Sequence, residues 1–279
     1  MAGQPQLLER VYEDRASLLD QINGVSPWHR LHRLRIGQIL APFVRPTCRV
    51  LDLASGTGMA TRAFAGQVAS LVQVDLLPKM IDLARAASTA PPKEGQVEFV
   101  RDDAVHFAET TPRKFDLVVM HQALNFFEDP ERLFAAISRI MADDGMFIFD
   151  IDGRLRWCVI EALNGHIENA LTIARDGFDR DRNIVGAEYR FWDGDEIEAL
   201  LRRARLLPSI LQGIGYVAPY LHVFNSSAEF LSPANLDPRA ARYLDDREFE
   251  KLVELDRHFE GCLEKDAAGW LVFGARKLA

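Results

Sequence analysis

Short apolar runs rich in β-branched residues alternate with longer amphipathic stretches through the middle of the chain. This alternation is typical of a parallel sheet whose two faces are covered by helices. The expected strands are 49–54, 71–76, 97–101, 115–120 and 146–151, and the expected helices between them are 57–66, 78–87 and 130–141. The pattern therefore predicts an α/β fold built on a doubly wound, mostly parallel sheet.

The segments on either side of this block have helical periodicity. Before it, apolar residues recur at helical spacing behind Pro27, which predicts an N-terminal helical cap. After it, residues 154–174 place apolar side chains on one stripe, which predicts an inserted lid helix. A helix capped by Asp193 or Asp195, a loop over 213–236, a charged helix over 238–262 and a strand over 269–277 are expected to follow. The predicted organisation is a cap (1–48), a core (49–152), a lid (153–190) and a C-terminal part of the core (191–279).

Composition narrows the class of protein. The 279 residues are 48% hydrophobic and 27% charged, as in a globular protein, and the net charge of −8 argues against nucleic acid or an anionic membrane as a partner. The three cysteines are too widely spaced for a metal or redox pair. The acidic start lacks the features of a signal peptide, and no apolar run is long enough to span a membrane. A cytoplasmic protein is expected, and it could form a homodimer.

The most informative motif is RVLDLASGTGMAT at 49–61, which is a hydrophobic strand, a turn of small residues and an expected helix start. Gly56 and Gly58 permit positive φ and close approach to a ligand, and an open parallel sheet binds ligands beyond the carboxyl ends of its strands. The dinucleotide fingerprint requires a third small residue, where this chain has Thr61. The motif therefore departs from that of nicotinamide oxidoreductases.

With Asp52 placed before this turn, the chain resembles the class I S-adenosylmethionine-dependent methyltransferases, although Ala54 replaces the first glycine of their motif. The resemblance extends over about 45–152 and more weakly to the end of the chain. It implies a Rossmann-like, seven-stranded sheet, S-adenosylmethionine as cofactor and S-adenosylhomocysteine as product. In the family, the acid at Asp75 binds the ribose hydroxyls and the acid at Asp103 binds the adenine amino group. The cofactor contacts implied are Tyr12, Asp52, Ala54, Ser55, Gly56, Gly58, Asp75, Leu76, Met80, Asp103, Ala104 and His121.

His121 directly follows the fourth expected strand and is the candidate catalytic base, since a hydroxyl acceptor needs a group that takes up a proton near neutral pH. A contact with the cofactor or with a loop carbonyl is an equally good interpretation. His166 lies on the lid stripe, where a hydrogen-bonded core histidine is the alternative. The candidate substrate contacts are Trp28, Gln122, Asn125, Phe126, Trp157 and His166. No metal site is predicted, because His29 and His32 lack further ligands at suitable spacing.

The sequence thus predicts methyl transfer to oxygen or nitrogen of a small organic molecule, with natural-product metabolism as the expected context. Three alternatives stay open. The cofactor could serve carbon alkylation or cyclisation, the chain could be a cofactor-binding partner protein without turnover, or it could be an NAD-dependent oxidoreductase.

Overall fold

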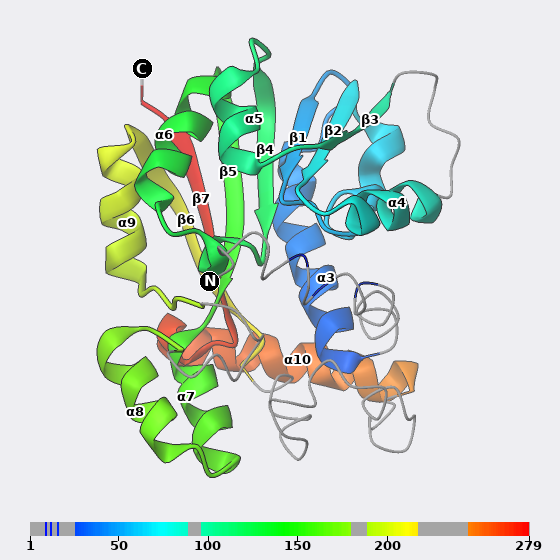
Figure 1. Ribbon diagram of the computed structural model, residues 1–279. Helices are drawn as coiled ribbons and strands as arrows, with labels where there is room; N and C mark the ends of the chain where they lie inside the picture. Colours follow the sequence, from blue (N-terminus) through cyan, green and yellow to red (C-terminus); the bar gives the residue numbers. More distant parts are fainter. Residues whose placement is uncertain are drawn as a thin grey trace. The chain divides into compact units, whose positions relative to one another are not determined.

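The computed structural model describes residues 9, 12, 16, 26–88, 96–179, 189–216 and 245–278 (Figure 1). The chain divides into two compact units. Met1–Arg35, Ile151–Asp193 and Gln212–Leu271 form the helical unit, and Ile36–Asp150, Gly194–Leu211 and Val272–Ala279 form the sheet unit. No helix among the described residues is long and apolar enough to cross a lipid bilayer.

The strands are β1 (Arg49–Leu53), β2 (Ser70–Asp75), β3 (Val97–Arg101), β4 (Phe115–His121), β5 (Met141–Asp152), β6 (Leu206–Ile214) and β7 (Trp270–Lys277). The α-helices are α3 (Pro27–Leu40), α4 (Pro78–Ala87), α5 (Ala104–Thr110), α6 (Pro130–Ile140), α7 (Arg154–Leu163), α8 (Ile167–Asp176), α9 (Gly194–Arg203) and α10 (Asp246–Cys262). Short 3-10 helices are η1 (Ala41–Phe43), η2 (Arg62–Gln67), η3 (Leu124–Phe126) and η7 (Lys265–Ala267).

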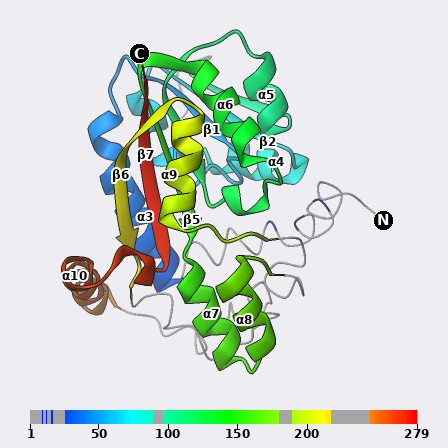
Figure 2. The same ribbon diagram turned by 90° about the vertical axis from the view of Figure 1, so that its left-hand side faces the viewer.

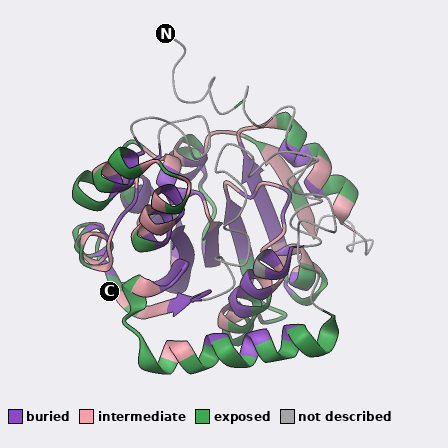
Figure 3. Cartoon of the chain, turned by 90° about the horizontal axis from the view of Figure 1, so that it is seen from below, coloured by how far each residue is buried: buried purple, intermediate pink, exposed green. Residues whose placement is uncertain are grey.

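The seven strands form one sheet in the order β3-β2-β1-β4-β5-β7-β6, and β1 to β5 pair in parallel. The chain order reverses between β1 and β4, which are neighbours in the sheet. The strands β1, β2 and β4 are mostly apolar and are buried along most of their length, as expected for strands inside a parallel sheet (Figure 3). The predicted Rossmann-like, mostly parallel, seven-stranded sheet is confirmed.

In the sheet unit, α5 packs beside α6 and α6 beside α9 (Figure 1). Asp103 and Asp129 cap α5 and α6 by accepting hydrogen bonds from backbone N–H groups of the first turn. The buried ring of Phe134 in α6 lies 5.2 Å from Phe149 of β5, whose ring stacks on Phe273 of β7. These contacts fix α6 against the middle of the sheet.

One prediction for the sheet unit is wrong, and one strand was missed. The helix expected at 57–66 is absent, and only the 3-10 helix η2 forms, from Arg62. The cause is that Ala54, Gly56 and Gly58 all have positive φ, so the chain turns tightly before it coils. The strand β6 was not predicted, because Pro208 and the polar residues that follow it break the apolar pattern.

The helical unit differs from prediction at the lid. The single helix expected over 154–174 is two helices, α7 and α8, packed side by side (Figure 2). The break falls at Gly165, whose φ is +84°. The stripe is not a buried face either, since Leu155 and Leu163 are 48% and 63% exposed.

The charged helix predicted at 238–262 is α10. It begins at Asp246 because Asp245 and Glu248 form a capping box. The part of this prediction before residue 245, and residues 217–236 of the predicted loop, lie outside the described residues.

Candidate functional site

The loop after β1 turns through three residues with positive φ, of which only Ala54 is strained. Ala54, Gly56 and Gly58 have φ values of 50°, 53° and 73°. The N–H of Ser55 donates to the carbonyl of Val74 at 3.0 Å, which ties the loop to the end of β2. A Cβ atom at Gly56 would have no neighbour within 4 Å, so the backbone there borders open space. At Gly58 a Cβ atom would displace the side-chain amide of Gln73, and the positive φ of 73° would strain any other residue.

Asp52 at the end of β1 is fully buried. The hydroxyl of Thr61 donates to Asp52 Oδ2 at 2.6 Å, and the amide of Gln73 donates to that hydroxyl at 2.9 Å. Oδ1 of Asp52 has no hydrogen-bond partner among the described residues. Burial raises the pKa of Asp52 from its ordinary value of 3.8 to about 7, against the lowering effects of the Thr61 hydrogen bond and of nearby His121. Thr61, which breaks the dinucleotide fingerprint, therefore holds the acid of the loop.

Asp75 joins the loop to the end of β2. Its Oδ2 accepts the N–H of Gly56 at 2.8 Å and its Oδ1 accepts the N–H of Leu77 at 2.9 Å. Burial raises the pKa of Asp75, while these two backbone hydrogen bonds lower it. Each carboxylate oxygen has a second lone pair, so the two oxygens can still accept hydrogen bonds from ribose hydroxyls.

The other predicted cofactor contacts of the sheet unit lie on the neighbouring elements. Leu76 is half-buried just after β2, and Met80 is buried in α4. Asp103 accepts the N–H groups of Val105 and His106 through one oxygen, which is the capping role, and Ala104 begins α5. Binding of adenine by Asp103 stays a prediction beside this structural role.

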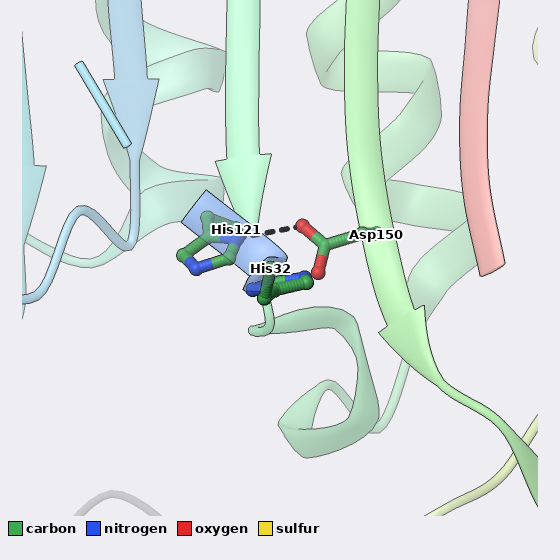
Figure 4. A group of neighbouring side chains, drawn as sticks. All are labelled: His32, His121 and Asp150. Atoms are coloured by element: carbon green, nitrogen blue, oxygen red, sulfur yellow. Dashed lines mark hydrogen bonds and ion pairs between the residues drawn. The ribbon is translucent and has the colours of Figure 1, made fainter. Parts of the chain in front are cut away.

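His121 ends β4 and pairs with Asp150 of β5. Nδ1 of His121 lies 2.7 Å from Oδ1 of Asp150, and the two residues are direct partners in the β4–β5 register (Figure 4). The side chain of Asp150 is 2% exposed and that of His121 is 13% exposed. Gln122 follows with a positive φ of 49°. The buried Asn125 and the half-buried Phe126 lie in η3. The end of β4 thus presents an imidazole ring whose Nδ1 faces a buried acid.

The remaining predicted contacts belong to the helical unit. Tyr12 is half-buried and contributes to the raised pKa of Tyr189, of which burial is the main cause. Trp157 is buried in α7, with its ring 6.4 Å from that of Phe191. His166 is not a core histidine. Its half-exposed side chain lies 3.2 Å from Oε2 of buried Glu161. The side chain of Trp28 lies outside the described residues. Cofactor contact by Tyr12 and substrate contact by Trp28, Trp157 and His166 stay predictions.

Thr61, Gln73 and Asp150 were not predicted as parts of the site. Asp150 had a usable signal, because it lies at the end of an apolar strand that was itself predicted. Polar residues at the ends of parallel strands share one edge of a sheet. Thr61 and Gln73 gave no such signal, because their roles depend on the path of the glycine loop.

The fold and this loop define a Rossmann-like cofactor-binding domain, and the comparisons with known proteins agree. A family model described as a methyltransferase domain matches residues 51–149. The malonyl-[acyl-carrier protein] O-methyltransferase of Geobacter sulfurreducens is 30% identical over 217 residues, which cover 75% of this chain and 74% of that protein. The chain belongs to the class I S-adenosylmethionine-dependent methyltransferases.

One further curated protein and one solved structure were also found to be similar to this chain. The ubiquinone biosynthesis O-methyltransferase of Xanthomonas campestris pv. campestris is 28% identical over 119 residues, 43% of this chain, and the chain spans about half the length of that relative. The magnesium protoporphyrin IX methyltransferase of Synechocystis PCC 6803, solved with bound S-adenosylhomocysteine, has a TM-score of 0.61 at 12% identity. That match covers 99% of this chain and 100% of the other, and it shows the shared fold.

The residues at the loop fit S-adenosylmethionine, the cofactor of this family. The cofactor is cationic and offers amino and hydroxyl donors. The loop offers the carboxylates of Asp52 and Asp75 as acceptors. Oδ1 of Asp52 and the hydroxyl of Ser55 are buried without a hydrogen-bond partner among the described residues. Open space beside Gly56 lets a ligand approach the backbone.

Proposed function

We propose that this protein transfers a methyl group from S-adenosylmethionine to an oxygen atom of a small organic acceptor. The observation that carries the proposal is the position of His121. It ends β4, the strand that pairs with β1, and β1 leads into the glycine loop. An amine acceptor needs only to be neutral when it attacks, whereas a hydroxyl acceptor needs a group that takes its proton. An imidazole at this point therefore favours oxygen over nitrogen.

When bound, S-adenosylmethionine supplies an electrophilic methyl group, which forms a bond to the acceptor oxygen as the electron pair of the S–CH3 bond returns to sulfur. His121 accepts the proton that the hydroxyl loses. Asp75 and the backbone of the glycine loop bind the cofactor. Gln122, Asn125 and Phe126 follow β4 directly and are proposed to contact the acceptor. The names of the Geobacter and Xanthomonas relatives, which are both O-methyltransferases, support oxygen as the acceptor atom.

The net charge of −8 supports a small-molecule acceptor over nucleic acid. A role in natural-product metabolism, a cytoplasmic location and a homodimer are parts of the proposal that rest on the sequence alone.

Titration calorimetry of the full chain tests the proposal, with S-adenosylmethionine, S-adenosylhomocysteine and NAD as separate ligands. We expect binding of the first two and none of NAD. Incubation with isotope-labelled S-adenosylmethionine and a panel of phenols, alcohols and amines then identifies the acceptor atom by mass spectrometry. The absence of heat with both sulfur ligands would reject the cofactor, and label found only on amines would reject the oxygen assignment.

A further inference from the structure

We propose that Asp150 is a positioning residue that fixes the tautomer of His121, with the hydrogen on Nδ1 and the lone pair on Nε2. The inference rests on the proposed function only for its role in the reaction. The pairing itself is a property of the protein alone and is measured without cofactor or acceptor.

The geometry of the pair is rigid. Nδ1 of His121 and Oδ1 of Asp150 are 2.7 Å apart, which is the distance of a short, charge-assisted hydrogen bond. Both residues stand on strands and face each other in the β4–β5 register. Groups held on adjacent strands keep their positions better than groups on loops.

The chemistry of the partner decides the tautomer. When the carboxyl group of Asp150 is ionised, it only accepts hydrogen bonds, so the imidazole nitrogen that faces it carries the hydrogen. Neutral histidine has one N–H group, and its other nitrogen, Nε2, then holds the lone pair. Figure 4 shows that this second nitrogen points away from Asp150. The carboxylate thereby selects the tautomer in which the nitrogen directed away from it is basic.

Burial makes the hydrogen bond between His121 and Asp150 stronger than the same hydrogen bond would be at the protein surface. The side chain of Asp150 is 2% exposed, and a buried carboxylate is costly unless donors face it. Water therefore competes little for this hydrogen bond.

The chain contains a matched control pair in the same unit. Nδ1 of His106 lies 2.9 Å from Oδ1 of Asp102 at the start of α5. The side chain of His106 is 64% exposed, so solvent competes for this bond. Asp102→Asn makes the same chemical change as Asp150→Asn at a position away from the end of β4.

The first experiment records long-range proton–nitrogen correlation spectra of the full chain labelled at histidine nitrogens, with His121→Gln used to assign the His121 signal. We expect the wild-type protein to show neutral His121 with its hydrogen on Nδ1. Asp150→Asn should produce a mixture or the opposite tautomer, because an amide can donate to Nδ1. Asp150→Glu should retain the wild-type tautomer, and Asp102→Asn should leave it unchanged.

Wild-type His121 with its hydrogen on Nε2 would overturn the proposal, and that measurement requires no variant to fold. An unchanged tautomer in Asp150→Asn would overturn it as well. Calorimetry with S-adenosylmethionine tests the proposed function separately from the tautomer of His121. Failure of the wild-type protein to bind it would reject the proposed function while the tautomer result stands.

Kinetics with a hydroxyl acceptor provide the second readout. Asp150→Asn should lower kcat by about 10²- to 10⁴-fold, the range that general base catalysis contributes, with the Kd of S-adenosylmethionine nearly unchanged. Asp150→Glu should recover part of the rate and Asp102→Asn should leave it unchanged. A kcat for Asp150→Asn equal to that of the wild-type protein would contradict a positioning role.

Discussion

Replacing Asp52 by Asn should change how the stability of the protein depends on pH. The side chain is fully buried at the end of β1, and burial raises its pKa from 3.8 to about 7. Asn has nearly the same shape, and its carbonyl can still accept the hydrogen bond from Thr61. The substitution therefore removes the ionisation of this group with little change in packing.

The sign follows from proton binding. Because the pKa of Asp52 is higher in the folded state, the folded protein binds more protons than the unfolded chain between pH 3.8 and about 7. The free energy of unfolding must then fall as the pH rises through this interval. Each pKa unit corresponds to about 1.4 kcal/mol, so ionisation of Asp52 costs about 4 kcal/mol once the pH is above the folded-state value.

Urea denaturation followed by circular dichroism measures the effect. Between about pH 5 and about pH 8, the stability of Asp52→Asn relative to the wild-type protein should increase by about 3 kcal/mol. Asp116→Asn is a control of opposite sign, because hydrogen bonds from Arg49 lower the pKa of Asp116. That variant should be less stable than the wild-type protein near neutral pH, and its deficit should shrink as the pH falls. Parallel pH profiles for Asp52→Asn and the wild-type protein would refute the reasoning.

Three further results are expected. Asp75→Ala should lose most of the thermal stabilisation by S-adenosylmethionine, which is about 2.7 kcal/mol at 100 times Kd for the wild-type protein, and an undiminished shift would remove Asp75 from the cofactor site. Because both positions have positive φ, Ala54→Gly should stabilise the protein by about 1 kcal/mol and Gly56→Ala should destabilise it by a similar amount in urea denaturation. A stability equal to that of the wild-type protein in both variants would contradict backbone strain at these positions. Because the pKa of Asp52 is raised to about 7, binding of the cationic S-adenosylmethionine near pH 7 should release protons from the wild-type protein and fewer from Asp52→Asn. Calorimetry in buffers of different ionisation enthalpy measures this release. Equal release by the two proteins would exclude Asp52 as the source of the protons.

The central part of the sheet was predictable because β1, β2, β4 and β5 are largely buried and therefore appear as mostly apolar runs in the sequence. The strands from 49–54 to 146–151 were found to within a few residues, except that β5 begins earlier, at Met141. The order of β1 and β4 as neighbours follows the rule for folds of this class. The local pattern of apolar residues was sufficient to predict a strand wherever successive residues of that strand are buried.

Prediction failed where the backbone departs from repeating geometry. Ala54 adopts positive φ although its side chain disfavours it, and the expected helix therefore starts late and as a 3-10 helix. Gly165 divides the lid helix for a similar reason. The pairing of His121 with Asp150 depends on register, which a single strand's sequence does not contain.

The cost of keeping Asp52 ionised is itself informative about function. An asparagine at this position would avoid about 4 kcal/mol of desolvation near neutral pH, so an acid here opposes the stability of the fold. Groups of this kind gather at functional sites, where a ligand offsets the cost. Asp52, Asp75 and Asp150 all lie near the carboxyl ends of parallel strands in the sheet unit. A cationic ligand complements that edge of the sheet, and the burial that makes the acids costly also strengthens their attraction to it. We therefore propose that binding of the cationic cofactor offsets the cost of ionising Asp52, which the protein without ligand bears at this edge of the sheet.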